Sequence, residues 1–173
     1  MPLKQMKRST TNGLIFILVA AASILLDQVA KAFVVAYVEP GRSITLIPHV
    51  LSLTHSTNSG SAFGLFKGSG QIVFLAALVV VVLTFAWFFA FRKKQSVWSF
   101  VGLGLIIGGA LGNLIDRVAR HNHQVVDFFD LGWWPVFNVA DIAIVAGVII
   151  VVVVTALELW REETDNPEYT EVL

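Results

Sequence analysis

Charge is scarce in this sequence of 173 residues. Only 14% of the residues are Asp, Glu, Lys or Arg, whereas about 25% is usual for a soluble domain. Hydrophobic residues make up 56% of the chain, and its mean hydropathy is +0.76. The composition therefore favours an integral membrane protein.

Two further absences narrow the possible functions. Acidic and basic residues number 12 each, so the chain has no net positive charge to attract nucleic acid, and we expect no nucleic-acid partner. The chain also contains no cysteine, which excludes disulfides, cysteine-ligated metals and thiol nucleophiles. Any catalytic chemistry has to come from other side chains, such as carboxylates, histidines and serines.

Four apolar segments are long enough to cross a bilayer, which takes about 20 helical residues. We expect these helices at residues 13–37, 71–91, 97–115 and 136–159. The first segment follows a basic stretch and also fits the apolar core of a secretory signal peptide, but no soluble domain follows for such a peptide to export. We therefore expect a single membrane domain, residues 1–173, with both termini on the same side.

Lysine and arginine indicate which side that is. Lys4, Lys7, Arg8 and the basic residues 92–94 flank the spans on the side of the termini. Basic residues near the ends of spans favour the cytoplasm. We therefore predict cytoplasmic termini.

The connection at residues 39–70 has two kinds of sequence. Residues 43–47 and 50–55 alternate apolar and polar side chains around a proline, which predicts two short strands. Residues 58–70 are rich in Gly and Ser and predict irregular backbone at the membrane surface. The acidic tail, residues 162–173, is predicted to be disordered.

Glycines recur every four residues in the third predicted span, at Gly104, Gly108 and Gly112. One face of that helix is therefore nearly bare backbone, which lets another helix pack closely against it. The spacing does not match the GxGxxG nucleotide-binding fingerprint, and no strand precedes it.

Two carboxylates stand in apolar surroundings within residues 124–144. Asp127 lies between valines and phenylalanines, and Asp141 lies one turn inside the fourth apolar segment. An ionisable group at membrane depth costs roughly 2.5–3.5 kcal/mol on insertion scales, which makes it a candidate functional residue. Two carboxylates in one poorly solvated site tend to share one proton. The ionised member can then activate a water while the protonated member polarises a carbonyl, as in an aspartic peptidase.

Other polar residues lie in or beside the spans. Asp27 and Lys31 are spaced for a helical ion pair, so Asp27 is either structural or helps to orient the site. Asn113, Asp116 and Arg117 share one face at the end of the third span. Arg117 either neutralises an acid, hydrogen-bonds a substrate carbonyl or extends to the membrane interface. Alternatively, Asp116 and Arg117 only cap the helix and bind each other.

Asn138 shares a face with Asp141 and either caps the fourth helix or orients a water or substrate carbonyl. Two rival chemistries are weaker. A metal site would use His121, His123, Asp127 and Asp130, but the HExxH pattern of zinc peptidases is absent. A serine site would use His55 with Ser59 or Ser61, but the sequence lacks the GxSxG spacing.

Five short motifs, in order along nearly the whole chain, resemble the bacterial lipoprotein signal peptidases (signal peptidase II). They are LDQVAK around Asp27, NSGSAFG around Asn58, GGALGNLIDR ending the third span, VVDFFD around Asp127 and FNVADIAI around Asp141. The resemblance implies that Asp127 and Asp141 are the catalytic pair.

The same resemblance implies a set of supporting residues and a fold. Residues that bind substrate or support the site would be Asp27, Asn58, Gly60, Asn113, Asp116, Arg117 and Asn138. Small residues that pack closely would be Gly60, Ala62, Gly108 and Gly112. The fold would be an all-α integral membrane protein with four transmembrane helices, and with a small extracytoplasmic β-cradle and loop between the first two.

The implied function is an intramembrane aspartic endopeptidase of the bacterial cytoplasmic (inner) membrane. Its substrates would be prolipoproteins that carry a diacylglyceryl-cysteine, cut on the N-terminal side of that cysteine near the extracytoplasmic face. No metal or other cofactor is expected, and the partners would be substrate and membrane lipids, with the protein a monomer. The alternative is a non-enzymatic four-helix scaffold or transporter subunit, whose acids would serve ion pairs or a proton path.

Overall fold

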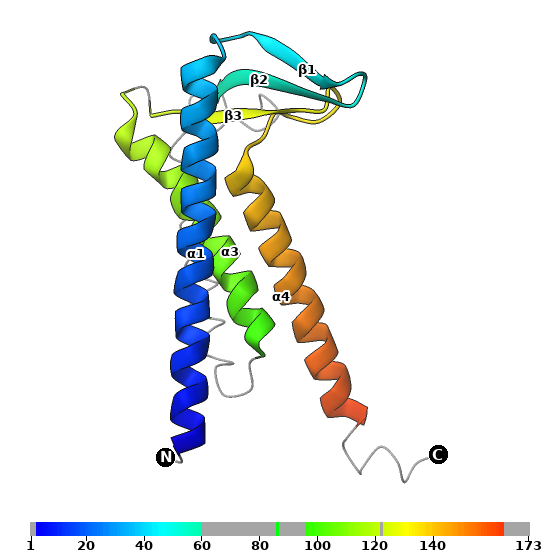
Figure 1. Cartoon of the computed structure of the whole chain (residues 1–173). Coiled ribbons are helices and arrows are strands. Elements are labelled where there is room, and N and C mark those ends of the chain that lie inside the picture. Colours follow the sequence, from blue (N-terminus) through cyan, green and yellow to red (C-terminus); the bar gives the residue numbers. More distant parts are fainter. Residues whose placement is uncertain (1–2, 60–85, 87–95, 122, 165–173) are drawn as a thin grey trace.

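The computed structural model describes residues 3–59, 86, 96–121 and 123–164. Three helices, α1 (Leu3–Tyr37), α3 (Val97–Ala119) and α4 (Val139–Thr164), run beneath a small sheet in Figure 1. Each has a stretch that is long and apolar enough to cross a membrane. The predicted span at residues 71–91 lies outside the described residues.

The bounds of all three helices differ from the predicted ones. The start of α1 is at Leu3, in the polar stretch ahead of its apolar segment. Helix α3 continues to Ala119, beyond the predicted end at residue 115, so Asp116 and Arg117 are still helical. Helix α4 begins only at Val139, because Phe137 exchanges backbone hydrogen bonds with Phe129 instead of entering the helix.

The sheet has three antiparallel strands in the order β1-β2-β3: β1 (Ser43–Ile47), β2 (Leu51–Asn58) and β3 (Val125–Asp130). The alternation predicted the first two strands, and the structure pairs them as a hairpin. The third comes from the connection between α3 and α4 and was not predicted. Consequently the sheet joins two connections that are far apart in the sequence, and β3 lies beside the ends of the helices (Figure 1).

Bare backbone lets the helices approach closely. A Cβ added at Gly108 would lie 2.6 Å from Ser23 Cβ, and one added at Gly112 would lie 2.7 Å from Asp27 Oδ2. Both neighbours belong to α1, so the predicted close packing along the glycine face is confirmed. Gly109, on another face of α3, faces the Ala140 carbonyl of α4 in the same way.

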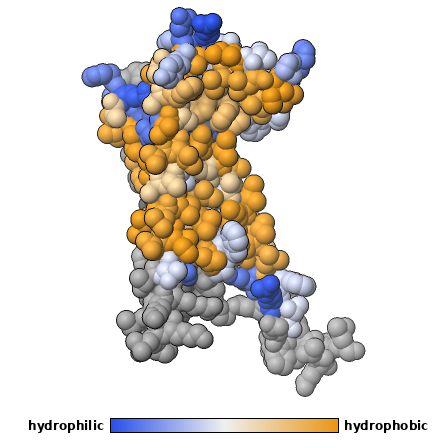
Figure 2. All heavy atoms as spheres, viewed as in Figure 1, coloured by the Kyte–Doolittle hydropathy of each residue, from blue (hydrophilic) through white to orange (hydrophobic). Residues whose placement is uncertain are grey.

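The outer surface of the helices is apolar. Leu25, Leu26 and Val152 are each at least 60% exposed, and Figure 2 shows hydrophobic side chains over the visible helical face and onto the sheet. Hydrophilic side chains gather above the sheet in this view. This distribution suits helices surrounded by lipid.

Candidate active site

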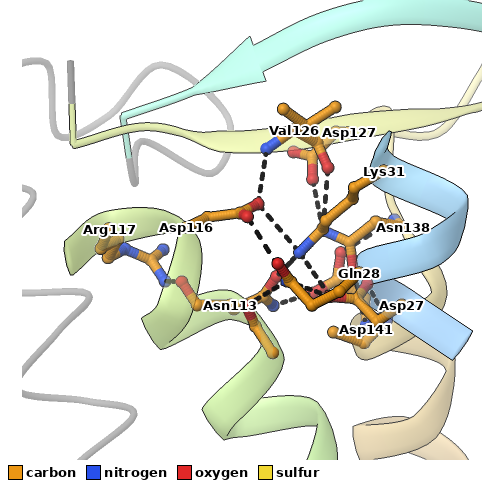
Figure 3. Close-up of polar contacts among 12 residues, drawn as sticks. Asp27, Gln28, Lys31, Asn113, Asp116, Arg117, Val126, Asp127, Asn138 and Asp141 are labelled. Carbon is orange, nitrogen blue, oxygen red and sulfur yellow. Dashed lines mark hydrogen bonds and ion pairs between the residues drawn. The ribbon is translucent and has the colours of Figure 1, made fainter. Parts of the chain in front are cut away.

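The two suspected acids come from different elements. Asp127 lies in the middle of β3 and is only 3% exposed, and Asp141 lies in the first turn of α4. Strand β3 crosses the end of the bundle, which directs Asp127 toward the start of α4 (Figure 3). The residue between these elements that connects the two carboxylates is Asn138.

Asn138 contacts both acids. Its side-chain Nδ2 donates to Asp127 Oδ1 at 2.6 Å, and its backbone N–H donates to Asp141 Oδ2 at 3.1 Å. Its Oδ1 accepts from the Asp141 N–H at 3.0 Å. The reciprocal bonds between Asn138 and Asp141 form a capping box, which satisfies backbone donors at the start of α4. Asn138 therefore both caps the helix and binds Asp127.

Asn113 holds Asp141 from the opposite side. Its Nδ2 donates to Asp141 Oδ1 at 2.9 Å, and its Oδ1 accepts from Asn138 Nδ2 at 3.0 Å. The two asparagines therefore form a hydrogen-bonded bridge that touches both carboxylates. An amide bridge of this kind fixes the orientation of the acids without adding charge.

Asp27 also belongs to the start of α4, although it lies on α1. Its Oδ1 accepts from the Ala140 N–H at 2.9 Å, and its Oδ2 pairs with Lys31 Nζ at 2.7 Å. Both side chains of the pair are fully buried. The ion pair predicted from the spacing is confirmed, and Asp27 additionally accepts from one of the free N–H groups of α4.

Asp116, on α3, binds residues of both α1 and β3. Its carboxylate pairs with Lys31 at 3.0 Å and with Arg120 at 3.2 Å, and it accepts from the Val126 N–H at 3.1 Å. Asp116 therefore fixes β3 one residue before Asp127. The charge of Asp116 also acts on Arg117, as suggested, while Arg117 Nη1 donates to the Asn113 carbonyl at 3.2 Å.

Sequence reasoning missed Gln28 and gave Lys31 only its helical partner, Asp27. Gln28 donates to Asp27, to the Gly112 carbonyl and to Asp116, and Lys31 contacts α3 as well as Asp27. The signal that points to them is their place within LDQVAK, directly beside Asp27 in the motif.

Two more predicted site residues are on or after β2. Asn58 ends β2 opposite Val125 and hydrogen-bonds Asp127 through its side chain. Gly60 and Ala62 lie outside the described residues. All the other predicted site residues are brought into one region, and Arg117 is close enough to Asp127 and Asp141 to interact with their charges.

Burial and a neighbouring negative charge raise the pKa of the Asp127 carboxyl group. Loss of water is the main cause, followed by the neighbouring charge of Asp141, and together they raise the pKa of Asp127 to about 7. Hydrogen bonds from Asn58 and Asn138 and the charge of Lys31 oppose that rise. Asp127 is therefore able to hold or release a proton near neutral pH.

The rival sites do not assemble in the described part of the chain. The ring of His55 is buried, with Nδ1 2.6 Å from the Val38 carbonyl oxygen, and His123 Nδ1 lies 2.7 Å from the Arg117 carbonyl oxygen. Among the described residues, no three His, Cys, Asp or Glu side chains are grouped to hold a metal. Ser61 lies outside those residues.

The fold and the site together define a helical membrane protein in which a buried carboxylate, Asp127, and a half-buried one, Asp141, lie beneath a small sheet. The family model described as signal peptidase (SPase) II matches residues 19–157. The chain belongs to this family.

Relatives and solved structures agree with that assignment. A lipoprotein signal peptidase of Syntrophomonas wolfei is 45% identical over 142 residues, which cover 81% of this chain and 91% of the relative. One from Rhodococcus jostii is 41% identical and covers 87% of this chain and 77% of the relative. A bacterial membrane enzyme solved at 2.3 Å superposes with a TM-score of 0.72 at 32% identity, covering 87% of this chain and 91% of that one.

Proposed function

We propose that this protein is an aspartic endopeptidase that removes signal peptides from diacylglyceryl-modified prolipoproteins. The cut falls on the N-terminal side of the lipidated cysteine. The observation that carries the mechanism is the amide bridge, in which Asn138 binds Asp127 and Asp141 at once. The names of the relatives supply the substrate class.

Asp127 and Asp141 carry the chemistry in this proposal. The pair holds one proton, because two carboxylates in one poorly solvated site do not both ionise easily. The ionised carboxylate removes a proton from water, and the protonated one donates a hydrogen bond to the scissile carbonyl. Water adds to the carbonyl carbon to give a tetrahedral diol. The carboxylates then exchange roles, and the amine leaves with a proton.

Neighbouring residues orient the two carboxylates and bind the substrate. Asn113 and Asn138 hold the carboxylates, and Arg117 supplies positive charge beside them. Asn58 and Gly60, with the residues that follow, cover the substrate, and Asp27 and Asp116 support the site. No metal or cofactor takes part.

The location of the site suits a lipid-anchored substrate. We place the protein, as a monomer, in the bacterial cytoplasmic membrane with both termini inside and the sheet at the extracytoplasmic face. The acyl chains of the substrate stay in the bilayer while the peptide reaches the pair from the side. A scaffold or transporter subunit is not favoured, because the buried acids of the described residues, Asp27, Asp116 and Asp127, lie together beneath the sheet (Figure 3).

Cleavage of a diacylglyceryl-modified prolipoprotein peptide in micelles tests the proposal. Asp127→Asn and Asp141→Asn should each abolish cleavage without unfolding the protein, since the amide keeps the shape and removes the acid. Asp130→Asn is the matched control on the same strand, because within the described part of the chain Asp130 accepts from Gly132 and Thr54 and contacts neither acid of the pair. EDTA should have no effect.

Each contrary result has a definite meaning. Near-normal cleavage by either pair variant would show that the pair is not catalytic. A wild-type protein that cuts no lipopeptide would contradict the proposed substrate. Inhibition by EDTA would contradict the metal-free mechanism.

A further inference from the structure

Lys31 is a buried cation whose contacts go beyond a helical ion pair. Its Nζ lies 2.7 Å from Asp27 Oδ2, 3.0 Å from Asp116 Oδ2 and 2.9 Å from Asn113 Oδ1, and its side chain is fully buried. An ammonium group has three N–H donors, and these three acceptors satisfy all of them. The third acceptor belongs to the amide that binds Asp141.

This third contact fixes the orientation of the Asn113 amide. Lys31 Nζ and Asn138 Nδ2 are both donors, and both point at one terminal atom of Asn113. That atom has to be the oxygen. The Asn113 nitrogen therefore faces Asp141 and donates to Oδ1. A flipped amide would place its oxygen against the Asp141 carboxylate and its nitrogen against the ammonium.

The charges of the cluster balance only with one proton on the pair. The carboxylates are those of Asp27, Asp116, Asp127 and Asp141, and the nearby cations are Lys31, Arg117 and Arg120. Among the residues that the structure describes, four carboxylates face three cations, so one shared proton makes this part of the cluster neutral. Removal of a cation from so buried a cluster favours uptake of a second proton.

We propose that Lys31 is a positioning residue that keeps the Asp127–Asp141 pair singly protonated and holds Asn113 in the orientation that donates to Asp141. It acts through Asn113 and through its charge. Its tie to catalysis rests on the proposed function, whereas its effect on the protonation of Asp127 does not.

In the described part of the chain, five charged or polar groups act directly on Asp127. They are Lys31 on α1, Arg117 on α3, Asp141 on α4, Asn138 just before α4 and Asn58 on β2. The other charged or polar groups on these elements bind elsewhere: Asp27 and Asp116 to Lys31, Arg120 to Asp116, His55 to the Val38 carbonyl, and Asp130 to Gly132 and Thr54. Of the five, Lys31 lies within the membrane part of the bundle, and its charge lowers the pKa of Asp127.

Infrared titration of the Asp127 carboxyl group tests the proposal without any substrate. The carbonyl band of protonated Asp127 is identified by its loss in Asp127→Asn. In Lys31→Met the band should persist to a pH about one unit higher than in the wild type, since an opposite charge nearby shifts a carboxyl pKa by that order. Lys31→Arg keeps the charge and should titrate near the wild type.

A charge-matched pair of variants covers the case in which Lys31→Met does not fold. Lys31→Met leaves the Asp27 carboxylate buried without its partner, and Asp27→Asn removes that carboxylate. The double variant Asp27→Asn/Lys31→Met should therefore fold, and its Asp127 band should persist to higher pH than in Asp27→Asn alone. The proposal would be overturned if the Asp127 band titrated equally in Lys31→Met and the wild type, and equally in the double variant and Asp27→Asn. Lys31 would then have only a structural role.

The pH profile of cleavage adds a catalytic readout. In Lys31→Met the acid limb of kcat should move to higher pH by the same amount as the infrared titration, while KM changes little because Lys31 does not face the substrate. A parallel loss of kcat at every pH would overturn the positioning role. If the wild type cuts nothing, the proposed function fails, and the infrared titration still decides the role of Lys31.

Discussion

At the scale of single residues, Asn138 has two separable tasks. Its oxygen and backbone cap α4 together with Asp141, and its side-chain nitrogen donates to Asp127. Serine is also a good N-cap but cannot supply the amide donor. We expect Asn138→Ser to unfold near the wild-type temperature and to lose most of its turnover.

Asn138→Ala is the companion variant for this prediction. It removes the cap as well as the donor and should cost about 1 kcal/mol of stability in addition to activity. Thermal unfolding in detergent and lipopeptide cleavage measure the two tasks separately. Full turnover in Asn138→Ser would show that the contact with Asp127 is not needed.

Asp127 makes stability depend on pH. Its pKa is raised from 3.8 to about 7 in the folded protein, so folding favours its protonated form. Stability from this group is complete below pH 4, falls as the pH rises to about 7, and is then constant, with a total change of ~4 kcal/mol. Thermal unfolding between pH 4 and 8 should therefore show a smaller decline in Asp127→Asn than in the wild type.

Asp130→Asn is the control for the pH series, because it leaves Asp127 in place on the same strand. It should keep the wild-type slope. Equal slopes for the wild type and Asp127→Asn would show that Asp127 is ionised in the folded protein throughout this range.

The suspected acids could be selected from the sequence because charged residues inside apolar runs are rare. Asp127 and Asp141 are conspicuous for that reason alone. Lys31 was assigned only to its helical neighbour Asp27, because its contact with Asn113 spans 82 residues and leaves no local pattern. Tertiary partners of this kind have to be read from a structure.

At the scale of elements, the packing of α1 on α3 places Asp27. Gly112 leaves room for the Asp27 carboxylate, and a methyl group there would lie 2.7 Å from Oδ2. The carboxylate has little freedom to move, since it binds Lys31 and Ala140. Gly112→Ala should therefore destabilise the protein by roughly 1–3 kcal/mol and reduce cleavage.

Gly13→Ala is the matched helical control. Among the described residues, nothing outside its own stretch of helix lies within 4 Å of a Cβ added there, so the better helix propensity of alanine should leave stability unchanged or higher by up to about 1 kcal/mol. Thermal unfolding of both variants in one detergent compares them. Equal effects would show that the Gly112 contact does not set the helix spacing.

The strands show which elements local sequence reveals. Strand β1 has the predicted bounds, because its side chains alternate. Strand β3 was missed, since VVDFFD has apolar residues on both sides of its acid and so lacks a clear alternation. Its pairing with β2 joins residues near 55 to residues near 127, and such long-range pairing leaves no local signal.

At the scale of the whole molecule, the start of α1 and the end of α4 lie at the end of the bundle opposite the sheet (Figure 1). The cysteine-free sequence allows the orientation to be tested with single cysteines. Thr45→Cys on exposed β1 and Thr164→Cys at the exposed end of α4 mark the two ends.

A membrane-impermeant maleimide should label Thr45→Cys in intact cells, and Thr164→Cys only after the cells are opened. The reason is the predicted cytoplasmic position of the termini, which the basic residues near them favour. The wild type should remain unlabelled in both conditions. The reverse pattern would invert the predicted topology.

The hydrogen bond from Ala140 to Asp27 spans 113 residues, and this bears on the biosynthesis of the protein. The ribosome makes Asp27 early, whereas the Asp127–Asp141 pair and its capped helix come from the last third of the chain. The pair acquires its full set of contacts only when the last helix joins the first in the membrane. Under the proposed function, proteolytic competence is therefore a late event, reached only after residues 1–141 have been made and α4 has joined α1.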